Sequence, residues 1–149
     1  MTAAISPPTL LDLNREECLR LLGTAAVGRV VVLTPAGTPV IRPVNYVFDE
    51  ASQSVVFRCE DGTKLISLLR AGRAWFEVDE IGPARRAGWS VIVAGVTEMV
   101  ARPDEIRRLQ GHALDSWAAG PSAKWFRIRA RVVSGRRLGP SVLVTERST

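Results

Sequence analysis

Residues 54–69, SVVFRCEDGTKLISLL, carry three signals of local structure in succession. Val55, Val56 and Phe57 form a short apolar run of strand-favouring residues, and the Asp-Gly pair at 61–62 is a strong turn signal. Thr63 follows at the position where a helix would begin, because the apolar residues of LISLL come directly after it at helical spacing. The stretch therefore predicts a strand, a tight turn and the first turns of a helix.

The start of this predicted helix is a candidate site for a phosphate group. Free backbone N–H groups and the positive end of a helix dipole favour an anion at such a position. Thr63 supplies a hydroxyl, Lys64 an ammonium group, and Arg58 stands on the strand just before them. Alternatively, Thr63 is only the helix N-cap and the two cations are only solvated surface residues. The residues by themselves leave both interpretations open.

Length and composition indicate a single soluble domain. The chain has 149 residues, of which 46% are hydrophobic and 23% charged. No apolar run approaches the roughly 20 residues that cross a bilayer, and the start MTAAISPPTLLDL lacks the features of a signal peptide. The two cysteines, Cys18 and Cys59, are too few for a disulfide framework or a metal cluster. We therefore expect a cytoplasmic protein with no membrane contact and no metal.

The formal net charge of +5 comes almost entirely from arginine. The basic residues are spread along the chain, and no helix-turn-helix, zinc-finger or basic-helix pattern accompanies them. An anionic small molecule is therefore a better expectation than nucleic acid.

Groups suited to side-chain catalysis are scarce. His112 is the one histidine, it stands on a predicted helix, and neither a Ser/His/Asp set nor a zinc spacing can be built in this sequence. We assign no catalytic residue. If the protein is an enzyme, a bound cofactor is expected to perform the difficult step.

Turn signals and apolar periodicity divide the chain into short strands and three helices. Pro43 should lie at a sheet edge or in a bulge, because it cannot donate a ladder hydrogen bond, and Gly95 indicates a bend in the longest strand. The expected units are an arm at 1–13, one domain at 14–140 and a tail at 141–149. Within the domain we expect a helix at 14–23 that Asn14 caps, a helix from Thr63, and a helix at 103–120 with Ala113 and Trp117 on its apolar side. The expected strands lie at 27–33, 39–48, 55–59, 73–79, 89–100 and 125–133, with a loop at 80–87.

The order of these elements predicts a mainly β fold. Six strands joined mostly by tight turns favour a six-stranded antiparallel barrel with about three flanking helices. The regular strand-helix alternation of a parallel sheet is missing, so a Rossmann unit is not expected. In the last predicted strand, Trp125 lies on the otherwise polar face. We expect that tryptophan, or Trp75 on the 73–79 strand, to mark a contact surface.

Six segments together resemble the pyridoxamine 5'-phosphate oxidase-like family of FMN-binding split barrels. The resemblance is to its small flavin-nucleotide-binding branch, which includes nitroimidazole-resistance-type proteins. It covers about residues 11–140, and it depends on the order and spacing of the segments. They are VGRVVV (27–32), PVIRPVNYVFD (39–49), VVFRCEDGTKL (55–65), FEVD (76–79), GWSVIVAG (88–95) and SGRRLGP (134–140).

This resemblance implies a split β-barrel that forms a homodimer, with FMN in the grooves between the subunits. The residues that resemble the family's phosphate and ribityl contacts are Arg58, Cys59, Thr63 and Lys64. Those that resemble the strand beneath the isoalloxazine ring are Arg42, Val44 and Asn45. Those that resemble a second flavin-facing strand are Trp89, Ser90 and Val91. Arg137 resembles the arginine that the partner subunit places near the ring.

The sequence also departs from the family pattern. Thr63-Lys64 stands where the oxidases carry an Arg-Lys pair, and no match to their substrate-phosphate residues is found, so vitamin B6 oxidation is not expected. The leading hypothesis is an FMN-dependent oxidoreductase that acts on a small molecule. The alternatives are a flavin-binding carrier or sensor without turnover, a deazaflavin-dependent reductase, and a split barrel that binds no cofactor.

Overall fold

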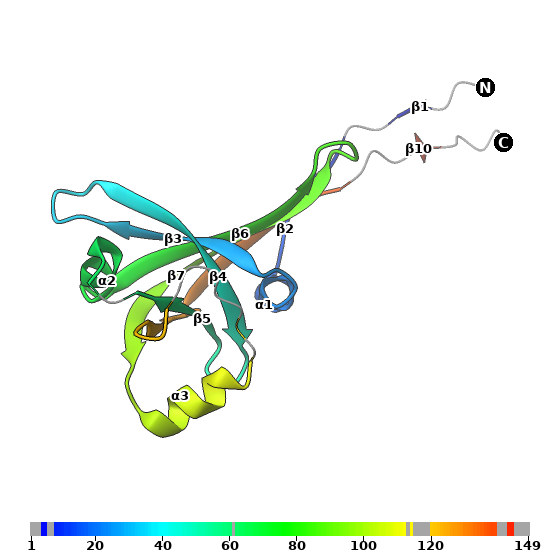
Figure 1. The fold of residues 1–149 in the computed structure, drawn as a ribbon. Helices are drawn as coiled ribbons and strands as arrows, with labels where there is room; N and C mark the ends of the chain where they lie inside the picture. Colours follow the sequence, from blue (N-terminus) through cyan, green and yellow to red (C-terminus); the bar gives the residue numbers. More distant parts are fainter. Residues whose placement is uncertain are drawn as a thin grey trace.

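A computed structural model describes residues 4–5, 8–60, 62–112, 114, 120–139 and 143–144 (Figure 1). The helices in these ranges are α1 (Arg15–Leu22), α2 (Lys64–Leu69) and α3 (Pro103–Gln110). The strands are β1 (Ala4–Ile5), β2 (Leu10–Asp12), β3 (Val27–Leu33), β4 (Pro39–Asp49), β5 (Ser54–Cys59), β6 (Arg73–Gly82), β7 (Ala87–Val100), β8 (Lys124–Arg129), β9 (Val132–Leu138) and β10 (Leu143–Val144).

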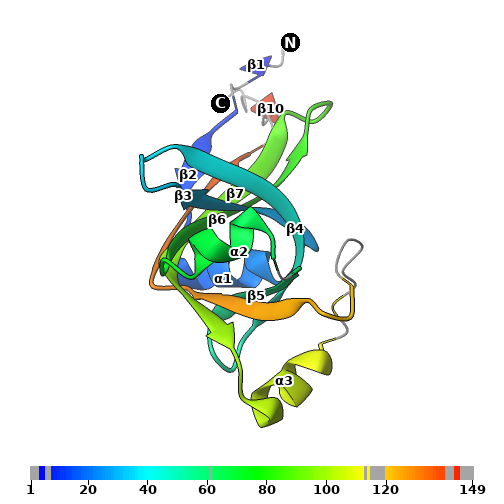
Figure 2. The ribbon, with the colours of Figure 1, turned by 60° about the vertical axis from the view of Figure 1, so that its left-hand side comes forward.

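Six antiparallel strands close into a barrel in the order β3–β4–β5–β8–β7–β6, with β6 paired back to β3. Strand β9 adds to the free side of β7, and β2 adds to β9. The short pair β1–β10 lies beyond the tip of the β6–β7 hairpin (Figures 1 and 2). The six-stranded antiparallel barrel predicted from the sequence is confirmed.

The barrel is split because two long strands change partners along their length. Strand β4 pairs with β3 up to Asn45 and with β5 from Tyr46 onward. Strand β7 pairs with β6 up to Val96 and with β8 from Thr97 onward. The bend expected at Gly95 falls at this second exchange. A Cβ at Gly95 would lie 2.0 Å from the carbonyl oxygen of Arg129, so only glycine allows the two strands to approach so closely.

Two apolar clusters hold the fold together. The main cluster fills the barrel with side chains such as Phe57, Phe76 and Ile128, and the apolar faces of α1 and α2 pack into it. The smaller cluster lies outside the barrel, where Leu109 of α3 contacts Trp125 and its neighbours. The expectation that Trp125 marks a contact surface is therefore wrong, because its ring is buried beneath α3.

The helix that begins at Pro103 is shorter than predicted. It ends at Gln110, with Gly111 as its C-cap, rather than at the Gly120-Pro121 pair. Ala113 and Trp117, which we had placed on its apolar side, lie outside the described residues. None of the helices in the described ranges has the length and apolar character needed to cross a membrane.

The strand predicted at 125–133 is in fact two strands, β8 and β9. The chain leaves the sheet at Ala130, whose N–H donates to the carbonyl of Gln53 at 2.9 Å. Arg15 reinforces the break, because its guanidinium donates to the carbonyls of Ala130 and Arg131 at 2.6 and 3.4 Å. The alternation of apolar and polar residues continues through the break, which is why the pattern predicted one strand.

The segment predicted as a loop at 80–87 is mostly strand. Strand β6 continues to Gly82 and β7 begins at Ala87, so the two form a long hairpin. Its tip is tight, with the N–H of Arg86 donating to the carbonyl of Pro83 at 3.3 Å. Arg86 adopts a left-handed backbone with φ of 47°. The glycine, proline and arginines at 82–86 therefore form only a short turn.

A buried carboxylate ties α3 to the β4–β5 hairpin. Asp49 is 1% exposed and accepts hydrogen bonds from both terminal nitrogens of Arg108, at 2.7 and 2.9 Å. It also accepts from the backbone N–H and hydroxyl of Ser52, and lies 3.0 Å from Nε2 of His112. The Arg108 guanidinium holds the pKa of Asp49 well below its usual range. His112, the single histidine, thus lies beside a structural carboxylate.

We predict that Asp49→Asn lowers the free energy of unfolding by about 2 kcal/mol at pH 7, because a charge-assisted pair is lost. The depressed pKa makes the Asp49 carboxylate stabilising above the unfolded-state pKa of about 3.9. That stabilisation is lost as the pH falls further, toward the pKa of the folded state. Urea unfolding at a series of pH values should show that the difference in the free energy of unfolding between wild type and variant becomes smaller below about pH 4. Asp104→Asn, at an exposed position, is the control. A difference in the free energy of unfolding that did not change with pH would contradict the stabilising role of the Asp49 carboxylate.

Candidate functional site

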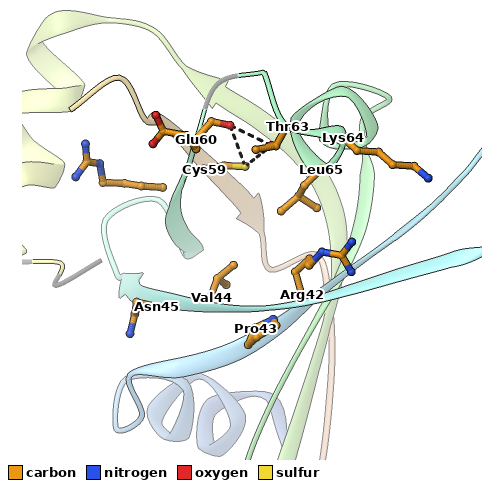
Figure 3. Close-up of a pocket in the computed structure, with 10 residues that line it drawn as sticks. Arg42, Pro43, Val44, Asn45, Cys59, Glu60, Thr63, Lys64 and Leu65 are labelled. Atoms are coloured by element: carbon orange, nitrogen blue, oxygen red, sulfur yellow. Dashed lines mark hydrogen bonds between the residues drawn. The ribbon is translucent and has the colours of Figure 1, made fainter. Parts of the chain in front are cut away.

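A cavity of about 390 Å³ opens between β4, the end of β5 and the start of α2 (Figure 3). Seven of the eleven sequence-predicted site residues line it, although they come from two separate stretches of the chain. They are Arg42, Val44, Asn45, Arg58, Cys59, Thr63 and Lys64. Pro43, Glu60 and Leu65 complete the lining.

One wall of the cavity is an unpaired strand edge. Strand β4 has β3 on one side only until it reaches β5 at Tyr46. Pro43 lies in this edge segment, opposite Arg29 in a register without a bulge, which confirms the expected edge position. The side chains alternate along the edge: Arg42 and Val44 point toward Leu65 of α2, and Asn45 points to the opposite side (Figure 3).

Thr63 caps α2. Its Oγ1 accepts a hydrogen bond from the N–H of Ile66 at 3.4 Å and donates to the carbonyl of Glu60 at 3.0 Å. Cys59, which is buried, places its Sγ 3.5 Å from the same hydroxyl. The hydroxyl proton of Thr63 is therefore already used in a hydrogen bond to the protein backbone. The N-cap interpretation accounts for this residue, and the cations are the groups available to an anion.

Three of the residues that line the cavity are cations. Arg42 and Lys64 are exposed, and Arg42 donates to the neighbouring carbonyl of Ile41 at 2.9 Å. Arg58 donates to the carbonyl of Gly120 at 3.2 Å, and its guanidinium lies over the Trp125 ring, while its Nε is buried without a hydrogen-bond partner. None of the three forms a salt bridge within the described part of the chain.

Glu60 is a cavity residue that the sequence did not indicate. Its carboxylate accepts from the N–H of Gly120 at 2.8 Å and from the hydroxyl of Ser122 at 2.5 Å. It points away from Lys64 and Arg42 (Figure 3). Glu60 therefore fastens the 120–123 loop at the rim through Gly120, whose carbonyl also accepts from Arg58. The sequence around Glu60 carries no signal of this role, because the role depends on contacts with Gly120 and Ser122.

The other four predicted site residues lie elsewhere in the chain. Trp89 and Ser90 line a second cavity of about 240 Å³. Val91 is fully buried in the barrel, in a segment of β7 that is paired on both sides. Arg137 forms a salt bridge with Glu17 of α1 at 2.9 Å. The chain by itself therefore does not bring these residues to the first cavity, and their role in binding stays a prediction.

Residues 14–137 match the family model described as pyridoxamine 5'-phosphate oxidase. The chain belongs to this family. An uncharacterized protein of Mycobacterium tuberculosis is 32% identical over 134 residues, which cover 87% of this chain and 86% of that protein. The family predicted from the ordered sequence segments is therefore confirmed.

Solved structures agree with this assignment. A FAD binding protein from Mycobacterium smegmatis is 33% identical, with 85% of this chain and 98% of that chain covered and a TM-score of 0.74. A FAD-binding protein from Mesorhizobium loti is 27% identical, with coverage of 86% and 97% and a TM-score of 0.72. A putative 5-nitroimidazole antibiotic resistance protein from Bacteroides thetaiotaomicron is 11% identical, with 95% of each chain covered and a TM-score of 0.69. That last likeness concerns the fold alone.

Proposed function

We propose that this protein binds a flavin nucleotide in the first cavity and acts as a flavin-dependent oxidoreductase on a small molecule. The observation that carries the proposal is the set of three cations, free of salt bridges in the described ranges, around a cavity of about 390 Å³. Family membership supports the same ligand class, and two of the relatives above are named for binding FAD. When bound, a flavin supplies electron-transfer chemistry that side chains cannot supply.

The residues present fit a flavin that carries phosphate. Lys64, Arg42 and Arg58 provide the positive charge that a phosphate needs, with guanidinium groups suited to paired contacts with its oxygens. Val44 and Leu65 provide an apolar surface for a flat ring, and both line the same cavity. Glu60 keeps its carboxylate on the 120–123 loop, so that phosphate does not face an unshared negative charge. The residues of this chain would thus bind and orient the flavin and neutralise the charge of its phosphate.

Anaerobic reduction distinguishes an enzyme from a flavin carrier or sensor. We expect the protein to bind FMN or FAD when each is offered, and NADH or NADPH to bleach the visible absorbance of the bound flavin. An electron acceptor should then restore it. Offering a deazaflavin in parallel tests that alternative. A flavin that binds but is never reduced would favour the carrier or sensor, and failure to bind any of the three cofactors would contradict the proposed function.

We predict that Lys64→Ala weakens FMN binding about ten- to a hundredfold, since a charge-assisted phosphate contact contributes about 1.5–3 kcal/mol. Titration of the quenching of flavin fluorescence measures the affinity directly. Arg107→Ala removes the same charge from the exposed side of α3 and is the matched control. The loss should shrink at high salt, because screening weakens the wild-type contact. Equal affinities for wild type and Lys64→Ala would show that the phosphate lies elsewhere.

We also propose that two copies of the chain associate through the outer face of the sheet. One cross-strand row there is apolar, and it runs over five strands through Ile41, Val31, Trp75, Ala94 and Val132. Ile41 is 53% exposed and Val132 is 67% exposed, and the nearby Ile92 and Val96 are 45% and 48% exposed. A contiguous, partly exposed apolar row of this kind is typical of an interface.

The charged side chains beside this apolar row nearly cancel one another's charge. Arg29 contacts Glu77 at 3.4 Å and Asp79 at 3.3 Å. Burial and the neighbouring Asp79 carboxylate raise the pKa of Glu77 to about 7. Because the three groups together carry little net charge near neutral pH, two copies of this face would not repel each other strongly. A second subunit is also the element that would bring residues such as Trp89 to a flavin in the first cavity.

We predict that Val96→Glu converts a dimer into a monomer without unfolding it. Val96 is 48% exposed on the outer face and pairs with Arg73, so the new carboxylate gains a cross-strand cation in the protomer. Packed against a second copy, however, it would bury a charge. Sedimentation velocity measures the oligomeric state. Met99→Glu lies three residues along the same strand, beside α2 rather than on this face, and should leave the dimer intact. A monomeric wild type would contradict the proposal.

A further inference from the structure

Glu60 is an acidic residue in the lining of a cavity that we propose for an anion. Because like charges repel, a carboxylate at this position is expected to weaken the binding of a phosphate. The side chain, however, points away from Lys64 and Arg42 (Figure 3). It is also half-buried rather than exposed to solvent. The presence of this carboxylate therefore calls for a role other than direct contact with the ligand.

Both carboxylate oxygens of Glu60 accept hydrogen bonds from the 120–123 loop. Oε2 accepts from the N–H of Gly120 at 2.8 Å, and Oε1 accepts from the hydroxyl of Ser122 at 2.5 Å. The loop is itself a tight turn, because the N–H of Ala123 donates to the carbonyl of Gly120 at 3.1 Å. Hydrogen bonds to an ionised acceptor are stronger than those between neutral groups. Glu60 therefore holds this turn firmly against the end of β5.

The same turn restrains the guanidinium of Arg58. Nη2 of Arg58 donates to the carbonyl of Gly120 at 3.2 Å, and the guanidinium carbon lies 5.5 Å from the centre of the Trp125 ring, on the cross-strand partner of Arg58. An arginine side chain has many rotamers, and fixing them costs conformational entropy. The Gly120 carbonyl and the Trp125 ring restrict these rotamers before any ligand binds. Arg58 is therefore preorganised.

One donor of Arg58 lacks an acceptor inside the protein. Its Nε is buried and has no hydrogen-bond partner among the described residues. Buried polar groups normally have a partner, because removal from water without a hydrogen bond is unfavourable. Arg58 also lines the first cavity. An acceptor that comes from outside the chain would satisfy this donor.

We infer that Glu60 is a positioning residue of the anion site and that it acts on Arg58 through Gly120. Glu60 holds the turn, the Gly120 carbonyl holds the guanidinium, and the Nε–H of Arg58 is kept available to a phosphate oxygen. Because that phosphate belongs to the flavin, this role rests on the proposed function. Its consequence is one that charge alone would not produce, since removing a negative charge from the cavity should weaken the binding of an anion.

FMN titrations of two Glu60 variants test this role. Glu60→Ala loses both hydrogen bonds to the turn, and we expect FMN to bind about tenfold more weakly, despite the gain in positive charge. Glu60→Gln removes the same charge but keeps an acceptor for Gly120, and its amide can donate to the hydroxyl oxygen of Ser122. It should bind FMN at least as tightly as wild type. Glu16→Ala removes an exposed carboxylate of α1, outside the lining, and should bind as wild type does.

A double-mutant cycle shows whether Glu60 acts through Arg58. In the Arg58→Ala background, Glu60→Ala should no longer weaken FMN binding, because the group that Glu60 positions is missing. An equal loss in both backgrounds would overturn the inference, since it would indicate a general disturbance of the cavity. Unchanged or tighter FMN binding by the single variant Glu60→Ala would also overturn it, because Glu60 would then be neutral or merely repulsive.

A measurement without flavin separates this inference from the proposed function. The buried Nε–H of Arg58 should exchange its proton with water slowly in wild type and in Glu60→Gln. Exchange should be fast in Glu60→Ala, where the turn is released and water reaches the guanidinium. Proton–nitrogen NMR spectra follow this signal, and its loss in Arg58→Lys identifies it. Fast exchange in wild type, or equally slow exchange in all three proteins, would overturn the positioning role. The expected exchange pattern together with a failure to bind FMN would contradict the proposed function alone.

Discussion

The exchange of partners along β4 is the constraint on which the first cavity depends. A strand that kept β5 beside it over its whole length would have a closed sheet at Arg42 and Val44. Because β4 meets β5 only from Tyr46 onward, its first half has an open edge. The start of α2 faces that edge and supplies Lys64 and Leu65 across the gap. The same geometry explains why Pro43 is tolerated, since its missing N–H lies where a ladder partner is absent on one side. The way in which β4 closes the barrel therefore also creates the first cavity.

The closing of the barrel on its other side requires close backbone contact rather than an open edge. At Gly95, β7 passes so near the carbonyl of Arg129 that no side chain fits. Gly28 meets the same condition inside the barrel, where a Cβ would lie 2.2 Å from the Phe76 ring. Protein interiors are packed densely enough that such overlaps cannot be absorbed without moving a strand. These two glycines therefore allow β3 to pack closely on Phe76 of β6 and β7 to approach the end of β8.

Sequence patterns predicted what local chemistry determines. Asn14 caps α1 and Thr63 caps α2, as their positions before apolar helical runs indicated, and strand β3 has the predicted bounds because turn residues border its apolar run. The break between β8 and β9 was missed, since it depends on Arg15, more than a hundred residues away, donating to carbonyls in an uninterrupted alternating pattern. The cavity residues were found because they lie in two short segments of family-like sequence. Glu60 was missed because its role depends on a distant loop.

The surplus of positive charge has a structural distribution that composition does not reveal. Several carboxylates are each shared by two arginines: Glu98 contacts Arg127 and Arg129, and Glu105 contacts Arg127 and Arg108. These pairs link β7 to β8 and α3 to β8, and they use acidic residues that would otherwise neutralise cations elsewhere. The guanidinium and ammonium groups around the first cavity then form no salt bridge within the described ranges. A cation that has no salt bridge to break binds an anion at lower cost than one already paired. The excess of arginine is thus more than a general source of solubility, because the fold leaves part of it without salt bridges around the cavity where an anionic ligand would be held.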